Sequence, residues 1–374
     1  MVEDNRIYLT GLTMLKGIGD TLARQLLQYF GNEAEKVFAA KKQTLEKIPG
    51  IGAIKAEAII QSKAEALRNA EQELAFVEKK KLRLFSITDE DYPVRLRECP
   101  DAPIVFYCKG SADLNVPYVL SIVGTRNATD YGEKLTVLFL KELSEMIPGL
   151  LVVSGLAYGI DICAHRNAVK FGLPTVGVLA HGLDRLYPSL HRKTAIEMIE
   201  QGGALLTDFV SGTTPERENF LQRNRLIAGL SDATIVVESA KKGGALVTAD
   251  IAFSYGREVY SFPGRVDDHY SEGCNWLIQT NKAGLITSAR DIVEALNWDL
   301  KEKKTTPQQS RLAFADDRPQ SPVLDAIAGK KQIQINELSL LLDIPVNQLS
   351  PLLFELELAG HIQAIPGGAY RLNF

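Results

Sequence analysis

Cysteine, histidine and tryptophan are scarce in this chain of 374 residues, which contains 4 Cys, 5 His and 2 Trp. The cysteines (Cys99, Cys108, Cys163 and Cys274) are scattered and form no Cys-x-x-Cys pair. We therefore expect reduced thiols in a cytoplasmic protein rather than a disulfide framework. The His and Cys residues also form no cluster with metal-ligand spacing, so no metal site is expected.

Long apolar runs are lacking too, and none approaches the roughly 18 residues that a membrane span needs. The first residues, MVEDNRIYLTGL, lack the basic start and apolar middle of a signal peptide. The formal net charge is −4, so the chain has no overall positive field. Any nucleic-acid site must therefore be a local basic patch. The length predicts two or three domains.

The most informative stretch covers residues 121–165. Apolar runs at 121–123 and 150–153 each end in Gly, Ser or Thr and then lead into helical patterns. Strands of a parallel sheet deliver small-residue loops and helix N-termini to one edge in this way. Free backbone N–H groups at such turns favour an anion, most often a phosphate. Arg126 adds a cation beside the first turn, so we expect a ligand that carries phosphate.

The first 70 residues contain an internal repeat of the sequence Gly-Ile-Gly. Residues 15–20 (LKGIGD) and 48–53 (IPGIGA) each precede a helical run, and an Ala follows the second Gly at the same spacing. The repeat resembles a tandem helix-hairpin-helix module, whose hairpin amides meet DNA phosphates. The alternative is a pair of tight helix–helix turns. We assign residues 1–70 to this module and expect a solvated, helix-like connector over 63–81.

Apolar strands alternate with helical stretches over residues 82–296, which predicts an α/β domain with an open, mostly parallel, extended Rossmann-like sheet. Candidate strands are 104–109, 119–123, 150–153, 175–179, 204–207, 234–237 and 259–262. Residues 301–320 are polar and rich in Pro and Gln, and they are interpreted as a linker. Residues 321–374 resemble a winged helix. Its third helix, VNQLSPLLFELELAG, lacks Lys and Arg, so packing or protein contact is favoured over DNA reading.

Several segments in fixed order resemble the DNA-processing protein A family, also called DprA or Smf. They are DEDYPVRLRECPDAPIVFYCKG (89–110), SIVGTRNATDYG (121–132), VVSGLAYGIDICAH (152–165), GVLAHGLDRLYP (177–188), ENFLQRNRLIAGLS (218–231), VVESAKKGGALVTADIA (236–252) and GREVYSFPG with EGCNWLI (256–278). The resemblance covers about residues 82–296, and the terminal modules fit the longer members. It implies a bacterial cytoplasmic homodimer that binds single-stranded DNA, protects incoming DNA and loads the RecA recombinase during natural transformation.

The candidate DNA-binding and phosphate-binding residues lie in the loops and helix starts expected at one edge of the sheet. They are Gly124, Thr125, Arg126, Ser154, Gly155, Gly159, Phe220, Arg223, Asn224, Arg225, Lys241, Lys242, Gly243 and Gly244. Each has a structural alternative: Arg126 can serve as a salt-bridge partner, an arginine of the Arg-Asn-Arg run can pair with Asp232 or Glu238, and Phe220 can belong to the core. The family usually has Pro after this Phe, and here Leu221 stands there.

An enzyme is the alternative interpretation. The same sheet type serves nucleotide phosphoribohydrolases that resemble the Lonely-Guy family, with a PGG-GT-x-x-E signature. The stretch 242–250 lacks the Thr and the Glu at the matching places, although Asp250 lies nearby. Neither HExxH nor GxSxG occurs, and GTRNATDYG is not the GxGxxG of dinucleotide-binding proteins. We therefore expect a binding protein without catalytic residues and without a cofactor.

Overall fold

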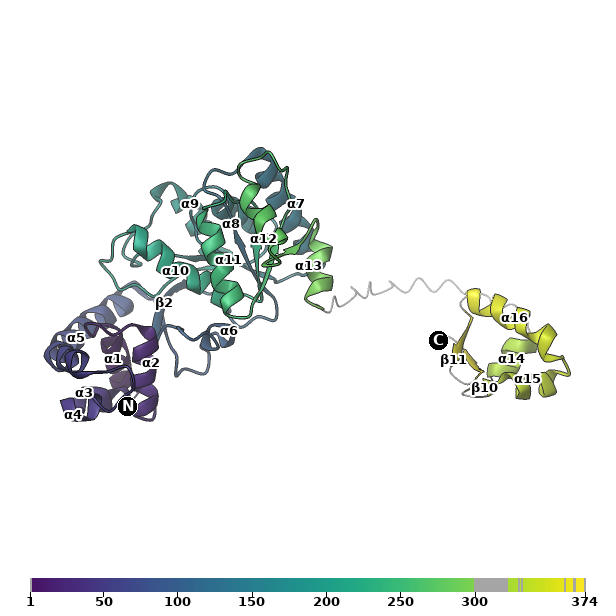
Figure 1. Ribbon diagram of the computed structural model, residues 1–374, viewed down its shortest axis with the longest axis horizontal. Helices are drawn as coiled ribbons and strands as arrows, with labels where there is room; N and C mark the ends of the chain where they lie inside the picture. The colour runs from purple at the N-terminus through teal and green to yellow at the C-terminus, as the bar shows by residue number, and fades with distance from the viewer. Residues whose placement is uncertain are drawn as a thin grey trace. The chain divides into compact units, whose positions relative to one another are not determined.

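The structure is a computed structural model that describes residues 2–298, 322–328, 330, 332–359, 361–365 and 368–372. The chain divides into two compact units, Met1–Leu300 and Lys301–Phe374, and each is described by itself (Figure 1). The linker expected at 301–320 lies outside the described residues. Among the described residues, no helix is both long enough and apolar enough to cross a membrane.

A nine-stranded sheet forms the centre of the first unit, with the order β1-β2-β6-β5-β4-β3-β7-β8-β9. In this order, every neighbouring pair from β6 across to β9 is parallel. Strand β2 pairs with β6 in the antiparallel direction, and β1 pairs with β2 in the same way. The strands are β1 (Arg83–Ser86), β2 (Val105–Gly110), β3 (Val119–Val123), β4 (Leu151–Ser154), β5 (Thr175–Val178), β6 (Ala204–Thr207), β7 (Ala233–Val236), β8 (Glu258–Ser261) and β9 (Gly284–Leu285). All seven expected strands form, and sequence reasoning missed β1 and β9.

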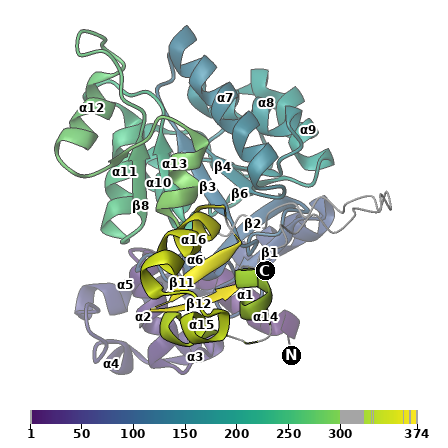
Figure 2. The same ribbon diagram turned by 90° about the vertical axis from the view of Figure 1, so that its right-hand side faces the viewer.

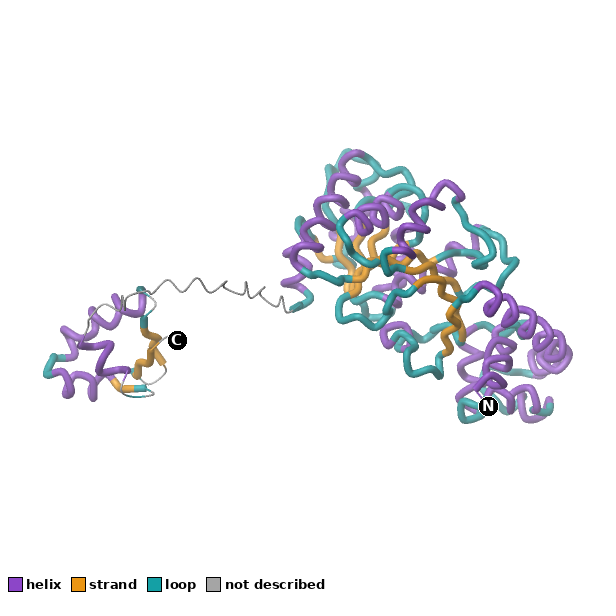
Figure 3. The backbone as a smooth tube through the Cα atoms, turned by 180° about the vertical axis from the view of Figure 1, so that it is seen from behind, coloured by secondary structure: helices purple, strands orange, loops and turns teal. Residues whose placement is uncertain are grey.

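Helices cover both faces of this sheet (Figures 2 and 3). One layer holds α7 (Asp130–Met146), α8 (Ile160–Lys170), η1 (Ser189–His191), α9 (Arg192–Glu200) and α13 (Ala289–Ala295). The other holds α6 (Val94–Arg97), α10 (Arg217–Leu230), α11 (Gly244–Ser254) and α12 (Glu272–Gln279). Strand β3 is buried throughout because its alternate side chains enter different cores: Val119 and Val123 pack with α10 and α11, whereas Leu120 and Ile122 pack with α7 and α8.

The sheet has its topological switch point between β3 and β7. The chain builds β4, β5 and β6 on one side of β3 and then returns to place β7 on the other side. Loops that follow two such strands diverge to opposite faces and leave a crevice at the carboxyl edge. The loop after β3 begins with Gly124, and the loop after β7 contains Lys241. The fold therefore brings together segments that are more than a hundred residues apart in the sequence.

The N-terminal helices pack on the β1–β2 edge of the sheet (Figure 1). They are α1 (Val2–Thr13), α2 (Asp20–Tyr29), α3 (Ala34–Ala39), α4 (Lys42–Leu45) and α5 (Ala53–Lys80). In the two Gly-Ile-Gly turns, Gly17 and Gly50 adopt φ of 77° and 81°, which glycine tolerates without steric cost. Helix α5 continues through the expected domain boundary at residue 70, and the division into domains 1–70 and 82–296 stays a prediction.

The expectation of a solvated connector at 63–81 was wrong. One face of α5 is buried along this stretch, with Ala66, Ala70 and Val77 in the core. The buried Glu73 carboxylate accepts hydrogen bonds from the backbone N–H and the hydroxyl of Ser211. The polar sequence of this stretch therefore concealed an amphipathic helix whose buried face carries Ala66, Ala70, Glu73 and Val77.

The second unit has the helices and hairpin of a winged helix. It contains α14 (Pro322–Ala328), β10 (Ile333–Gln334), α15 (Ile335–Leu342), α16 (Val346–Leu358), β11 (Ile362–Ile365) and β12 (Ala369–Leu372). The small antiparallel sheet has the order β10-β12-β11. Leu338, Leu349 and Leu353 anchor its core, whereas Phe354 and Leu358 on α16 are exposed.

Candidate nucleic-acid interface

A cleft of about 770 Å³ opens at the switch point, between the loops after β3 and β7 and the helices α10 and α11. Nine of the fourteen sequence-predicted residues line it: Gly124, Thr125, Arg126, Phe220, Arg223, Asn224, Lys242, Gly243 and Gly244. The other five are Ser154, Gly155, Gly159, Arg225 and Lys241. The fold thus gathers most of the predicted site from three separate segments.

Arg126 and Phe220 form the exposed side of the cleft. The Arg126 guanidinium lies 5.2 Å from the centre of the Phe220 ring, within the range of a cation–π contact. Arg126 is exposed, and among the described residues it has no ion-pair partner. The Phe220 ring is half-buried and lines the cleft instead of entering a core. Both residues are therefore placed for a ligand with phosphate and flat rings.

Arg223 forms the floor of the cleft. Its side chain is buried, and Nη1 donates hydrogen bonds to the carbonyl groups of Gly155, at 2.7 Å, and of Val178. Burial lowers the pKa of the Arg223 guanidinium to about 10, and the carboxylate of Asp161 opposes this shift. A side chain at Gly155 would meet Arg223, because a Cβ there would lie 2.5 Å from Nη1. Arg223 therefore holds the loop after β4 in place and adds positive charge at the floor of the cleft.

Carboxylates of the protein itself accept amides in the loops that lead into α7 and α8, where the sequence predicts amides free for a phosphate. At the start of α7, the Thr129 N–H donates to the buried Glu238 carboxylate at 3.0 Å, and the Thr129 hydroxyl donates to the same group. In the loop between β4 and α8, the N–H groups of Gly155 and Ala157 donate to Asp161 at 3.1 and 3.4 Å. Internal carboxylates occupy the positions expected for a phosphate.

At the start of α11, no carboxylate among the described residues accepts an amide of residues 241–244, and two lysines precede the helix. Gly244 is its first residue, and no group among the described residues accepts a hydrogen bond from the Gly244 amide. Lys241 and Lys242 precede it, both exposed and without an ion-pair partner in the described chain. Lys242 lines the cleft, and Lys241 stands just outside it. Amide, helix dipole and ammonium groups thus converge on one side of the cleft.

Arg225 does not belong to the cleft. Its guanidinium lies 2.8 Å from Asp20 at the start of α2 and also pairs with Asp208, so it joins the N-terminal helices to the sheet unit. Burial acts to lower the pKa of Arg225, and the carboxylates of Asp208 and Asp20 outweigh it, so the pKa is raised. The expected DNA contact at Arg225 is therefore corrected to a buried structural ion pair.

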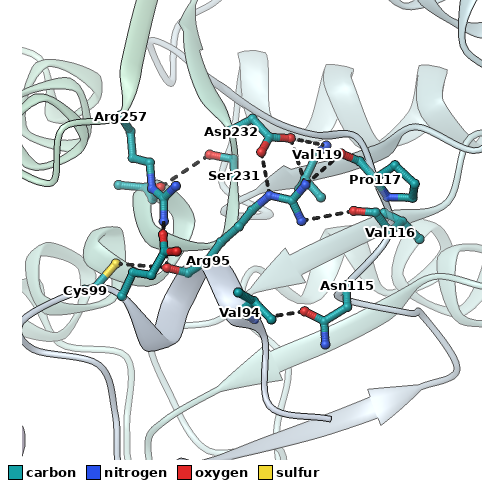
Figure 4. Close-up of polar contacts among 12 residues, drawn as sticks. Val94, Arg95, Cys99, Asn115, Val116, Pro117, Val119, Ser231, Asp232 and Arg257 are labelled. Carbon is teal, nitrogen blue, oxygen red and sulfur yellow. Dashed lines mark hydrogen bonds and ion pairs between the residues drawn. The ribbon is translucent and has the colours of Figure 1, made fainter. Parts of the chain in front are cut away.

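The acids proposed as alternative partners of the Arg-Asn-Arg run have other roles. Asp232 binds Arg95 on α6, with Nε to Oδ1 at 2.6 Å, and also accepts the Val119 N–H (Figure 4). The same close-up shows Arg257 reaching the Arg95 carbonyl. Glu238 holds the start of α7 as described above. Neither acid pairs with Arg223 or Arg225.

Ser154 and Gly159 shape the loops from behind. The buried Ser154 hydroxyl donates to the Ile122 carbonyl at 2.6 Å and so ties β4 to β3. Gly159 has φ of 72°, and a Cβ there would lie 2.1 Å from the Thr125 carbonyl oxygen. A side chain at Gly159 would push the two loops apart. Both residues support the cleft without lining it.

Sequence reasoning missed Arg217. It is the first residue of α10, it is exposed, and it lines the cleft one turn before Phe220. A signal was present, because a cation in the first helical turn opposes the helix dipole and needs another reason to be there. With Arg126, Arg223 and Lys242 it makes four cations among the described lining residues, against one carboxylate, Asp161.

Three family models match this chain. The family model of DNA recombination-mediator protein A matches residues 83–297. The chain belongs to this family. The model of the SAM-like helix-hairpin-helix tandem matches residues 9–65, and that of the DprA winged helix domain matches residues 306–368. The expected family and fold class are thereby confirmed, including both terminal modules.

Relatives in the DprA family cover most of the chain. Protein Smf of Escherichia coli is 35% identical over 310 residues, which is 82% of each chain. The structure of DprA from Streptococcus pneumoniae aligns with a TM-score of 0.64 and 31% identity over 77% of this chain and 97% of its own. DNA processing protein A from Helicobacter pylori, whose structure addresses its single-stranded DNA binding mode, aligns with a TM-score of 0.52 and 30% identity, covering 58% of this chain and 96% of its own.

Proposed function

We propose that this chain is a single-stranded DNA-binding recombination mediator. The observation that carries the proposal is the cleft at the switch point, where Arg126, Arg217 and Lys242 surround the Phe220 ring. Cations for the backbone and a ring for the bases are the parts that a single-strand groove needs. Membership of the DNA recombination-mediator protein A family and the likeness to the Helicobacter pylori protein support the same ligand.

Binding is expected to be independent of base sequence. The cleft offers guanidinium and ammonium groups to phosphates, and Asn127 and Asn224 are the only carboxamides among its described lining residues. Phosphate contacts position a strand, whereas base-edge contacts specify it. A paired strand also hides its bases from a ring such as Phe220, so oligo-dT should bind more tightly than a blunt duplex.

Membership of the family supports a finer proposal. We propose that the protein works in the cytoplasm as a homodimer, protects incoming DNA and loads RecA onto it during natural transformation. Two linked grooves raise the effective concentration of a strand at the second groove. The C-terminal half of the sheet unit suits the dimer surface, because Val266 and Leu285 are exposed there and neither lines the cleft.

A nucleotide hydrolase receives no support from the site. Asp161, the carboxylate that lines the cleft, already accepts two loop amides. Asp250 pairs with Lys282 at 2.7 Å and does not line the cleft. A general acid or base must reach the reacting bond, and neither group is placed to do so.

Fluorescence anisotropy with labelled oligo-dT and a blunt duplex tests the proposal. We expect tighter binding of oligo-dT, with a slope of log K against log salt of up to about −2 if the three exposed lining cations meet phosphates, at about −0.7 each. Arg126→Ala should weaken binding about tenfold or more, whereas Arg290→Ala, an exposed arginine on α13, should not. Equal binding of duplex and oligo-dT, or equal effects of the two variants, would contradict the proposal.

A further inference from the structure

The loop between β5 and α9 is firmly held although the proposed cleft makes no use of it. The buried His181 bridges the loop: its Nδ1–H donates to the Gly182 carbonyl at 2.9 Å, and its Nε2 accepts the Tyr187 N–H at 3.1 Å. Asp184 accepts the Gly212 N–H at 2.9 Å and so ties this loop to the loop between β6 and α10. Burial lowers the pKa of His181, consistent with this neutral tautomer. The loop is therefore built to present a fixed surface.

That surface exposes apolar side chains and adjoins the cleft at Tyr187. Tyr187 is 46% exposed, and its ring meets Phe220 edge-on with 6.1 Å between the centres. Leu190 is 76% exposed, and Tyr158, 40% exposed, packs edge-on against His191 at 5.0 Å. Rings left in water at the rim of a binding site usually mark further contact area.

Positive charge borders the same surface. Arg192 and Lys193 open α9 directly after His191, and both are exposed. Lys193 reaches Glu197 only at 3.8 Å, and Arg192 has no ion-pair partner among the described residues. Cations in the first turn of a helix oppose its dipole, as at Arg217, so both helix starts point to an anionic ligand.

We propose a second base-stacking site formed by Tyr187, Tyr158 and Leu190. This proposal rests on the function proposed above. A single strand that leaves the cleft over Phe220 continues onto the Tyr187 ring, and its backbone meets Arg192 and Lys193. Continuity with Phe220 and the bordering cations favour DNA over a protein partner, because stacking platforms and basic grooves occur together in single-strand sites.

Two oligo-dT lengths test the site on the full chain: about 4 nucleotides, enough for the cleft, and about 16, the upper end of single-strand site sizes. Tyr187→Ala should leave the short oligonucleotide unaffected and weaken the long one about tenfold. Tyr187→Phe keeps the ring and should bind both like wild type. Tyr29→Ala, an exposed tyrosine on α2, is the matched control and should change neither.

Several outcomes would overturn the second site. Unchanged binding of the long oligonucleotide by Tyr187→Ala would remove it. Equal loss for both lengths would make Tyr187 a support for Phe220, and a changed mass of the variant in light scattering would make the surface a protein contact. Failure of wild type to bind either length would instead refute the proposed function itself, so the two ideas fail separately.

Discussion

The arginines of α10 provide a sharp test, because Arg225 and Arg217 lie on one helix in opposite environments. Arg225 is 7% exposed and pairs with Asp20 and Asp208. Arg225→Met retains much of the side-chain volume and leaves these carboxylates without their cation. Removing one partner of a buried ion pair costs about 3–5 kcal/mol. At about 2 °C per kcal/mol for a large domain, the melting temperature should fall by about 6–10 °C.

The pH dependence of this loss is a second readout. Burial raises the pKa of Asp20, and Arg225 works against that rise. Without Arg225 the pKa rises further, so the folded state binds a proton at Asp20 more tightly than the unfolded state does. Stability then increases as pH falls, and the deficit of Arg225→Met relative to wild type should shrink on acidification.

Arg217→Met is the matched control for this experiment. It is exposed and has no ion-pair partner among the described residues, so its melting temperature should stay within about 1 °C of wild type. Its affinity for oligo-dT should fall about tenfold, as for loss of one charge-assisted contact. Calorimetry measures the melting temperature of both variants, and anisotropy measures their affinity for oligo-dT. An Arg225→Met protein that melts like wild type and loses DNA binding would show that Arg225 contacts DNA after all.

Further predictions concern the cleft, the core and the assembly. Lys242→Ala should weaken oligo-dT binding less than Arg126→Ala in the same anisotropy assay, because Lys241 stands beside it and can partly substitute. Burial lowers the pKa of His165 to about 3 in the folded state. The stability that depends on neutral His165 is therefore fully present above the pKa of this histidine in the unfolded chain, and it is lost as pH falls. We expect a loss of about 2 kcal/mol between pH of about 6.5 and about 5 in urea titrations, reduced in His165→Gln; an equal loss in the variant would refute this. Removal of residues 321–374 should leave oligo-dT affinity unchanged, and a large drop would assign DNA contacts to the winged helix. Light scattering at micromolar concentration should report twice the chain mass, and a single-chain mass would refute the homodimer.

Much of the fold was predictable because burial on both faces leaves a plain signature. Runs such as 119–123 and 150–153 are apolar without alternation, which is typical of a parallel sheet between helical layers. The sequence did not predict β1 and β9, because β9 has two residues and β1 begins with an exposed arginine. The sequence did not predict that one face of α5 is buried, because alanine gives a weak hydrophobic contrast against lysine and glutamate.

The helical period could have corrected the Arg-Asn-Arg prediction. Residues two apart on a helix point about 200° apart, so Arg223 and Arg225 cannot both face one cleft. The same period places Arg217, Phe220 and Asn224 on a single face, and all three line the cleft. The roles of Glu238 and Asp161 were not readable in this way, because only tertiary contacts decide which carboxylate reaches which helix start.

Those two carboxylates change what the site can recognise. A loop with free amides holds one phosphate in fixed geometry, which suits a mononucleotide. Here Glu238 accepts the N-cap amide of α7, and Asp161 accepts amides in the loop before α8, so a phosphate at either place would meet a negative charge. Recognition passes to side-chain cations around Phe220 and to the start of α11. Such groups adjust to many positions of a backbone, so the cleft suits a polymer that binds in any register better than a nucleotide that must be held at one bond.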